Sequence, residues 1–273
     1  MKNTNTAILV FACDKYELLY EGFDYFLNKN WGETISLQKY FATENIDLSL
    51  KGYTNLKSGK GEWTNRLKRV LNQIEEKYII FIQEDMWFGK KVPEKVLRQI
   101  IDYTEQNDLK LVKLHSTDAY KTKEINIDFS GFQLSEVIKE DSEFIMYHQV
   151  SIWDKNFLYE QLKDNEDPWR NEREGSKRLK KSNHNIYQID LFSYNNKQPL
   201  NSNEDEVEPG GYDTISSNAC IHPCAKKYIL ELMQVKPDYA QQLDYHLENH
   251  LTHDGKSKPR LEEIFDKLKK RFL

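Results

Sequence analysis

The sequence predicts an α/β protein with a mostly parallel central sheet flanked by helices and a helical elaboration at its C-terminal end. Short apolar runs alternate with longer segments in which apolar residues recur every three or four positions. The short runs are typical of strands buried on both faces, and the longer segments are typical of amphipathic helices. Helical connections between the first strands favour parallel pairing, because a parallel pair needs a long crossover.

The first half of the chain predicts a regular strand–helix alternation. This order is typical of a doubly wound sheet, which binds its ligands at the carboxyl ends of the strands. We expect strands at residues 7–14, 35–42, 78–83 and 109–115, and helices at residues 15–30, 63–74 and 92–103.

The second half of the chain is less regular. Loose alternation predicts a hairpin at one sheet edge, and Asp154 is a candidate N-cap for a short helix. We expect the hairpin at 125–137, a strand at 144–153, helices at 154–162, 226–233, 237–251 and 259–273, and loops at 165–178 and 201–211.

The charge balance argues against a general nucleic-acid-binding protein. The net charge is −5 and the pI is near 5.9, whereas nucleic-acid binding needs a basic surface. Basic residues cluster locally at 177–181 and 267–271. We expect solvated helix faces there, although such patches can also contact an anionic membrane or a phosphate-bearing acceptor.

Cysteine usage and hydropathy predict a cytoplasmic protein. The three cysteines, Cys13, Cys220 and Cys224, form no disulfide framework, which indicates a reducing compartment. The apolar run at 7–12 is too short for a signal sequence, and no apolar stretch in the sequence is long enough to span a bilayer.

The segment Tyr78–Gly89 contains the most informative pattern. Its apolar run ends in two adjacent carboxylates, Glu84 and Asp85. Carboxylates at the end of a buried strand lie where α/β sheets bind ligands, and such a pair can hold a divalent metal that binds a diphosphate. The alternative is a strand that simply runs into a polar loop.

Other motifs mainly exclude functions. The Gly-rich segment 58–62 lacks the spacing and the Lys-Ser/Thr pair of a P-loop, and neither a Gly-x-Ser-x-Gly nor a Gly-x-Gly-x-x-Gly motif is present. Hydrolase and dehydrogenase functions therefore lose their main support. His246 and His250, with His253 one turn further on, lack the Glu directly after the first His that a zinc protease motif needs, so we expect a polar helix face there. The pair Cys220/Cys224 lacks a partner pair, which argues against structural zinc.

Five short segments are informative through their order and spacing. They are Cys13–Tyr16, Gly61–Leu67, Phe81–Phe88, Ser151–Leu158 and Asp167–Arg178. Taken together, they resemble bacterial and viral GT-A-type glycosyltransferases over residues 7–180. The resemblance implies a nucleotide-sugar-dependent transferase with a Rossmann-like nucleotide-binding half and an acidic motif in the role of the family's DxD. Met86 replaces the second Asp of that motif, which leaves metal independence open.

The same resemblance suggests a domain organisation. We expect a GT-A-like catalytic domain at residues 1–225, with a nucleotide-binding half at 1–120 and an acceptor half at 121–225. A C-terminal helical extension would cover residues 226–273. A length of 273 residues accommodates this arrangement.

Glycosyl transfer requires that the leaving diphosphate be neutralised by a cation or by basic side chains. We expect Glu84 and Asp85 to bind Mn²⁺ or Mg²⁺, with Asp85 the better candidate for a direct ligand. Asp14 would recognise the base or ribose, or else cap the following helix. The remaining candidates for nucleotide-sugar binding are Asn65 and Arg66, whose alternative is an exposed helix face, and Lys177 and Arg178.

An acceptor hydroxyl must lose a proton, which suits a carboxylate base in an inverting reaction. Glu172 and Glu174 are the candidates, and the resemblance favours Glu172. Their side chains would point the same way in an extended loop but not in a helix. Trp153 and Trp169 are the candidate acceptor contacts, with Trp169 stacking on a sugar or packing in the fold.

The sequence thus predicts a transferase that moves a sugar from a nucleotide-sugar donor to a glycan or to a lipid-linked or surface-polysaccharide acceptor. Its basic C-terminal helix would contact the membrane peripherally. One alternative is a nucleotidyltransferase that makes activated sugars, although the glycines expected after the first strand are missing. The other is a catalytically degenerate GT-A domain that binds glycans or partners.

Overall fold

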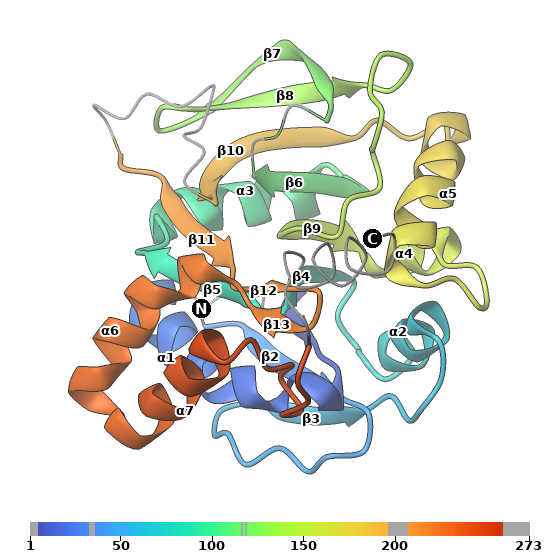
Figure 1. The fold of residues 1–273 in the computed structure, drawn as a ribbon. Helices are drawn as coiled ribbons and strands as arrows, with labels where there is room; N and C mark the ends of the chain where they lie inside the picture. The colour runs from blue at the N-terminus through green and yellow to red at the C-terminus, as the bar shows by residue number, and fades with distance from the viewer. Residues whose placement is uncertain (1–4, 33–35, 116, 118, 196–206, 259–273) are drawn as a thin grey trace, which may run out of the picture.

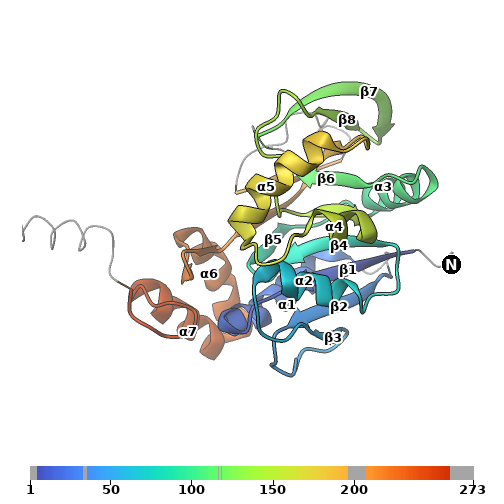
Figure 2. The ribbon, with the colours of Figure 1, turned by 90° about the vertical axis from the view of Figure 1, so that its right-hand side faces the viewer.

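The computed structural model describes residues 5–32, 36–115, 117, 119–195 and 207–258. An 11-stranded sheet crosses the molecule, with helices on both faces (Figures 1 and 2). Its strands are β1 Thr6–Phe11, β2 Gln38–Thr43, β3 Thr54–Lys57, β4 Tyr78–Gln83, β5 Met86–Lys90, β6 Leu111–His115, β7 Lys121–Phe129, β8 Phe132–Ile138, β9 Ser151–Asp154, β10 Tyr187–Tyr194 and β11 Gly210–Thr214.

The remaining elements are seven α-helices, two 3₁₀ helices and a small second sheet in the part of the chain that the structure describes. The small sheet pairs β12 Ser216–Ser217 with β13 Cys220–Ile221. The helices are η1 Asp14–Leu19, α1 Tyr20–Trp31, α2 Trp63–Leu71, α3 Glu94–Gln106, α4 Lys155–Gln161, α5 Pro168–Lys181, η2 Pro223–Ala225, α6 Lys226–Val235 and α7 Pro237–Glu248.

The predicted α/β class is confirmed. The main strand order is β3-β2-β1-β4-β9-β6-β10-β11-β5. Along this path β3, β2, β1, β4, β6, β10 and β11 run in one direction, whereas β9 and β5 run against them. The expected hairpin is β7–β8, which joins the sheet through β8 and β10. The carboxyl ends of β1, β4 and β6 therefore lie at one edge.

Strand β9 differs from the prediction. We expected a strand over residues 144–153, but only Ser151–Asp154 is extended, and it runs antiparallel between β4 and β6. Residues 144–150 are irregular. Their polar groups bond to helix α5 instead: the Met146 N–H donates to Ser176 Oγ (3.0 Å), and the His148 N–H donates to Glu172 Oε1 (3.0 Å).

Other elements also depart from the sequence expectations, among them β3, which was not expected. The aromatic residues after Asp85 form β5, and the charged segment at 165–178 forms α5 rather than a loop. Asp167 caps α5 by accepting a bond from the Arg170 N–H (2.7 Å), and Pro168 occupies its first turn. Strand β10 was not expected, and β11 follows the segment predicted as a loop. The expected tail helix at 259–273 lies outside the described residues.

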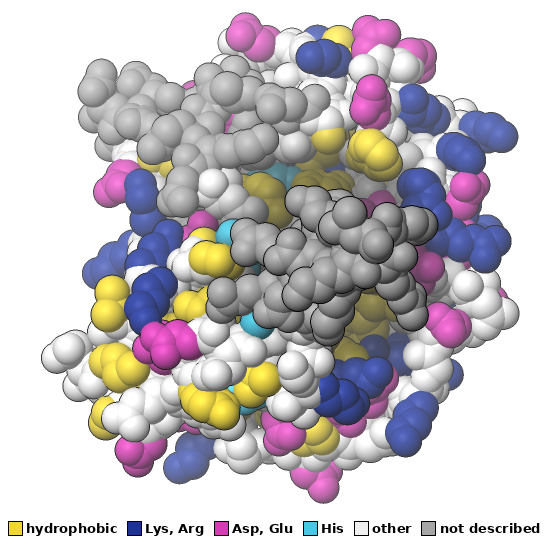
Figure 3. Space-filling model, viewed as in Figure 1, with side chains coloured by type: hydrophobic (Ala, Val, Ile, Leu, Met, Phe, Trp, Pro, Cys, Tyr) yellow, Lys and Arg dark blue, Asp and Glu magenta, His cyan; other side chains and the backbone are white. Residues whose placement is uncertain are grey.

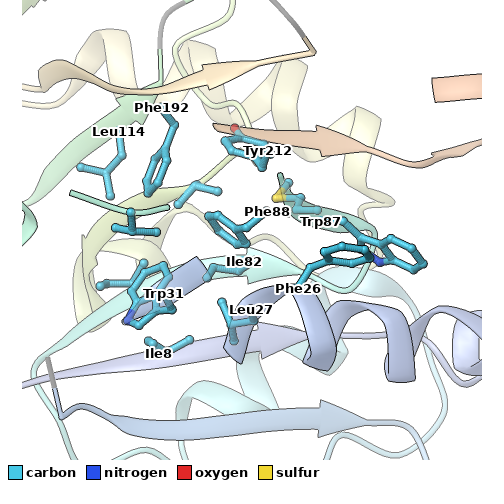
Figure 4. Packing of buried hydrophobic residues seen from close by; sticks show 14 of the residues in the cluster. Ile8, Phe26, Leu27, Trp31, Ile82, Trp87, Phe88, Leu114, Phe192 and Tyr212 are labelled. Atoms are coloured by element: carbon cyan, nitrogen blue, oxygen red, sulfur yellow. The ribbon is translucent and has the colours of Figure 1, made fainter. Parts of the chain in front are cut away.

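Two apolar clusters cover the two faces of the sheet. One contains α1, α3, α6 and α7 together with one face of the strands, and the other contains α2, α4 and α5 with the opposite face. Figure 2 shows α2, α4 and α5 on the near side of the sheet. Figure 4 shows the first cluster, in which Trp87 stacks on Phe26 with a centroid separation of 5.3 Å.

Asp154 confirms the predicted N-cap, since its carboxylate accepts bonds from the N–H groups of Asn156 and Phe157 at 3.0 Å. The three cysteines are free. Within the described ranges, no helix combines the length and the apolar character needed to cross a bilayer.

Replacement of Trp87 by Ala tests the first cluster. Trp87 is 0% exposed, so Trp87→Ala should lower the free energy of unfolding by about 3–5 kcal/mol. Trp169 is 69% exposed, so the control Trp169→Ala should change the free energy of unfolding by less than about 0.5 kcal/mol. Chemical denaturation measures both values, and equal losses would contradict this packing.

Candidate functional site

A pocket of about 490 Å³ lies at the carboxyl edge of the sheet. Strands β1 and β4 are parallel neighbours and deliver the residues that follow them to this edge. Because β9 is antiparallel, it delivers the residues that precede it to the same edge. The lining consists of Phe11, Ala12, Cys13, Tyr16, Trp63, Arg66, Gln83, Glu84, Asp85, Tyr147, His148, Gln149, Pro168, Trp169, Glu172, Ser216, Ser217 and Asn218.

Glu84 and Asp85 form the turn between β4 and β5, and both line this pocket. The Glu84 carboxylate is 5% exposed and accepts a bond from the Cys13 N–H (3.1 Å). Burial raises the pKa of Glu84, and the neighbouring Asp85 charge raises it further. Burial likewise raises the pKa of Asp85. The pair therefore carries negative charge poorly in the absence of a cation.

Arg66 is the cation nearest to this pair in the pocket wall, and it is 4% exposed. Its Nη2 donates to the Ala12 carbonyl (2.5 Å) and its Nε donates to Ser58 Oγ (3.1 Å). Its Nε also lies 3.4 Å from Glu44 Oε1. The alternative of an exposed helix face is wrong for Arg66, because the guanidinium is anchored inside the fold.

The donor set of the acidic pair fits a divalent cation. Carboxylate oxygens are the protein ligands that Mg²⁺ and Mn²⁺ prefer, and these ions take their other ligands from water and phosphates. A bound cation would offset the charges of buried Glu84 and half-buried Asp85, whose pKa values are both raised. Among the described residues, no group of three or more His, Cys, Asp or Glu side chains forms a ready metal site. Glu84 and Asp85 would thus share the coordination of the cation with phosphate oxygens of the ligand and with water.

Glu172 enters the same pocket from helix α5. Its Oε1 accepts the bond from the His148 N–H (3.0 Å). The His148 ring is held in turn: its Nε2 lies 3.0 Å from Asn171 Oδ1, and its centroid lies 4.4 Å from that of Trp63. Burial raises the pKa of Glu172, while the His148 N–H and the charge of Lys113 act to lower it.

The helical conformation of α5 separates the two predicted bases. The side chain of Glu174 is 40% exposed and pairs with Lys177 at 2.9 Å, and neither residue lines the pocket. Lys and Arg side chains gather at the right-hand edge of Figure 3, where Figure 1 places α5. The structure thus brings Glu172, but not Glu174, to the acidic pair.

The two predicted acceptor tryptophans have different environments. Trp169 lines the pocket and remains 69% exposed, so its indole face is free for a ligand. Trp153 is 1% exposed and packs in the second apolar cluster, with its centroid 6.2 Å from that of Phe157. The structure contradicts the placement of Trp153 at an acceptor site, since its position on β9 faces the core.

Three further candidates are occupied by contacts within the fold. The Asp14 carboxylate accepts bonds from the N–H groups of residues 44–46 at 2.7–3.2 Å, and it neither caps η1 nor lines the pocket. Asn65 Oδ1 accepts a bond from the Asn165 N–H (2.7 Å). Arg178 forms a two-pronged ion pair with Glu166 at 2.8 and 3.0 Å. These contacts fix the loops around the pocket.

Several pocket residues were not expected from the sequence. Trp63 stands in a segment that carries the GT-A resemblance, so its proximity to Arg66 was a usable signal. His148 was assigned to a strand, and nothing in its local pattern indicates its bond to Glu172. Ser216, Ser217 and Asn218 come from a hairpin more than 130 positions after Asp85, and only the fold brings them near.

No protein-family model and no curated protein matches the chain. Solved structures do match its fold. TarS of S. aureus, a GT-A glycosyltransferase, matches with a TM-score of 0.45 and 14% identity over 94% of this chain and 46% of TarS. TarS 1–349 in complex with UDP matches with a TM-score of 0.47 and 12% identity over 90% of this chain and 71% of the other.

A third match is CMP:2-keto-3-deoxy-manno-octonic acid synthetase complexed with CTP, with a TM-score of 0.40 and 15% identity over 68% of this chain and 89% of that one. This chain spans about half the length of the first TarS structure. The matches are similarities of general fold, and the residue roles proposed below rest on the geometry of the pocket.

The buried acidic pair predicts a specific pH dependence of stability. Because folding raises the pKa of Glu84 above its ordinary value of 4.5, the folded state binds more protons than the unfolded state. The contribution of Glu84 to the free energy of unfolding is then fully present below about pH 4.5, and it is lost as the pH rises towards neutrality. We expect Glu84→Gln to flatten this fall in metal-free protein, measured by urea denaturation across the pH range. The control Glu174→Gln should leave the slope in place, and an identical slope in both variants would contradict the burial of this charge.

Proposed function

We propose that this protein is a nucleotide-sugar-dependent glycosyltransferase in which Glu172 is the catalytic base. One observation carries the proposal: a carboxylate oriented by the His148 N–H and the acidic pair Glu84 and Asp85 line the same pocket from different elements. The first group suits deprotonation of an acceptor, and the second suits binding of a diphosphate through a cation. Their combination fits transfer of a sugar from a diphosphate carrier.

The chemistry assigns a distinct task to Glu172. Its carboxylate takes the proton of the acceptor hydroxyl while that oxygen forms a bond to the anomeric carbon. The bond from this carbon to the diphosphate oxygen breaks, so direct displacement inverts the configuration. Burial raises the pKa of Glu172, which brings the base closer to the working pH and strengthens it as a proton acceptor.

The leaving diphosphate would lie at the carboxyl end of β4. Glu84 and Asp85 would hold Mn²⁺ or Mg²⁺, and this cation supplies the positive charge that stabilises the departing phosphate oxygens. Arg66 adds a fixed positive charge to the same wall, although its N–H groups are bonded to Ala12 and Ser58. A metal-independent reaction would depend on Arg66 alone among the described cations that line this pocket.

The acceptor side of the pocket is marked by Trp169. Its large exposed fraction and its place in the lining suit stacking on a sugar ring, which offers an apolar face to an aromatic side chain. A glycan or a lipid-linked or surface-polysaccharide acceptor fits this arrangement. The process that we propose for the protein is polysaccharide biosynthesis at the cytoplasmic face of a membrane.

Nucleotide binding is the first test. The melting temperature should rise with one of UDP, GDP or CMP, and Mn²⁺ should increase the shift. Asp85→Asn should abolish the Mn²⁺-dependent part and leave any metal-independent part. If no nucleotide stabilises the protein, the transferase proposal fails and a degenerate binding domain becomes the better description.

Transfer itself is the second test, with donor screens scored by the nucleotide that is released. Release of a nucleoside diphosphate supports glycosyl transfer, whereas pyrophosphate release from a nucleoside triphosphate would support the nucleotidyltransferase alternative. Glu172→Gln should retain nucleotide binding and reduce kcat roughly 10²- to 10⁴-fold. The matched variant Glu174→Gln should remain active, and full activity of Glu172→Gln would place the base elsewhere.

A further inference from the structure

Lys113 is an unusual residue on β6. Its side chain is 0% exposed, and its Nζ has no hydrogen-bond partner among the residues that the structure describes. The Lys113 Nζ lies over the ring of Tyr120, 4.8 Å from the ring centroid. A buried ammonium group without a partner costs several kcal/mol, so burial of a lysine normally requires an ion pair or hydrogen bonds. The packing of the sheet alone gives no reason for this lysine.

The alternation of β6 places Lys113 on the same face as helix α5. Leu111 belongs to the apolar cluster of α2, α4 and α5, as does Tyr120, which contacts Lys113. Val112 and Leu114 belong to the opposite cluster. Lys113 therefore lies on the sheet face that α2, α4 and α5 cover, and Figure 2 shows these three helices on that side of the sheet. Glu172 projects from this helix into the pocket.

The ionisable groups around Lys113 leave Glu172 as its electrostatic partner. Burial and, to a smaller extent, the charge of Lys113 lower the pKa of His115 and of His148 to about 3, so both rings are neutral at pH 7. Burial raises the pKa of Tyr120 and of Tyr147, so these phenols stay protonated. Among the described residues, Asp190 and Tyr194 of β10 also act on the pKa of Tyr120, and Asp190 accepts a bond from Gln188 at 2.6 Å. Glu172 is the carboxylate whose charge raises the pKa of Lys113.

We propose that Lys113 is a positioning residue for Glu172, and that its buried positive charge holds the Glu172 carboxylate ionised and directed into the pocket. This inference rests on the proposed role of Glu172 as the base. Lys113 does not line the pocket, so it acts on the acceptor only through Glu172.

The electrostatics agree with this role in both directions. The charge of Lys113 lowers the pKa of Glu172, against the effect of burial. Burial lowers the pKa of Lys113, the charge of Glu172 partly offsets this effect, and the resulting pKa is about 7. Since the coupling is mutual, removal of either charge must shift the pKa of the other residue by a similar amount.

The test replaces Lys113 by Met, which has a similar length and no charge. The Glu172 side-chain carboxyl is followed by ¹³C NMR against pH and assigned by its absence in Glu172→Gln. In Lys113→Met the midpoint should rise by about one pH unit or more. The control Lys123→Met removes an exposed lysine of β7 that pairs with Glu136, and it should leave the midpoint unchanged.

Two further measurements separate positioning from a structural role. The acidic limb of the kcat profile should move upward with the Glu172 midpoint, while nucleotide affinity stays the same. Stability of Lys113→Met should equal or exceed that of the parent protein below pH 7, because the variant removes a buried charge. An unchanged Glu172 midpoint in Lys113→Met would overturn the proposal.

A reciprocal measurement covers the case in which Lys113→Met does not fold. In Glu172→Gln the NMR midpoint of the Lys113 Cε resonance should fall below that of the parent protein, and an unchanged midpoint would overturn the proposal equally. Both titrations are independent of transfer. A protein without transferase activity but with the two shifts would therefore contradict the proposed function and not the coupling of Lys113 to Glu172.

Discussion

The antiparallel insertion of β9 between β4 and β6 is the constraint on which the site depends. If β9 ran parallel to its neighbours, the residues that precede it would lie at the opposite edge of the sheet from Glu84. Because it runs against them, His148 and Gln149 reach the carboxyl edge. The His148 N–H then becomes available to a side chain of α5, and the bond to Glu172 joins the two halves of the pocket.

Helix α5 packs against the irregular segment 144–150, and side chains of α5 form hydrogen bonds with the backbone of that segment. Residues 144–150 form no strand, so their backbone groups need other partners. Ser176 and Glu172 accept bonds from two of these N–H groups. Gly175 permits the close approach, since a Cβ at this position would lie 2.8 Å from Met146 Cγ. The orientation of the Glu172 carboxylate is therefore a consequence of how α5 packs.

The sequence predicts the first half of the fold because its strands carry strong local signals. The run from Tyr78 to Gln83 is apolar and ends in carboxylates, which correctly places a buried strand with an acidic end. The direction of β9 has no such signal, because a four-residue strand reads the same whether it runs parallel or antiparallel. The charged pattern of α5 hides its narrow buried face, which consists of Asn171, Gly175, Ser176 and Leu179.

The same limit applies to the candidate residues of the site. Glu84, Asp85 and Glu172 follow from local patterns or from the resemblance, and the fold places them in one pocket. Trp153 carries an equally strong motif signal, yet its side chain points into the core. Side-chain direction on a strand depends on register, which short motifs do not encode.

Two buried cations act on the carboxylates of the pocket: Arg66 lowers the pKa of Glu84, and Lys113 lowers the pKa of Glu172. The hydrogen bonding of these two cations differs. Arg66 has a carbonyl, a hydroxyl and Glu44 as partners, so it stabilises the fold as well as adding charge near Glu84. Within the described residues Lys113 has no hydrogen-bond partner, and its charge lowers the pKa of Glu172. A buried cation that no hydrogen bond compensates, and that favours the ionised form of a pocket carboxylate, is better explained by the chemistry of that carboxylate than by packing.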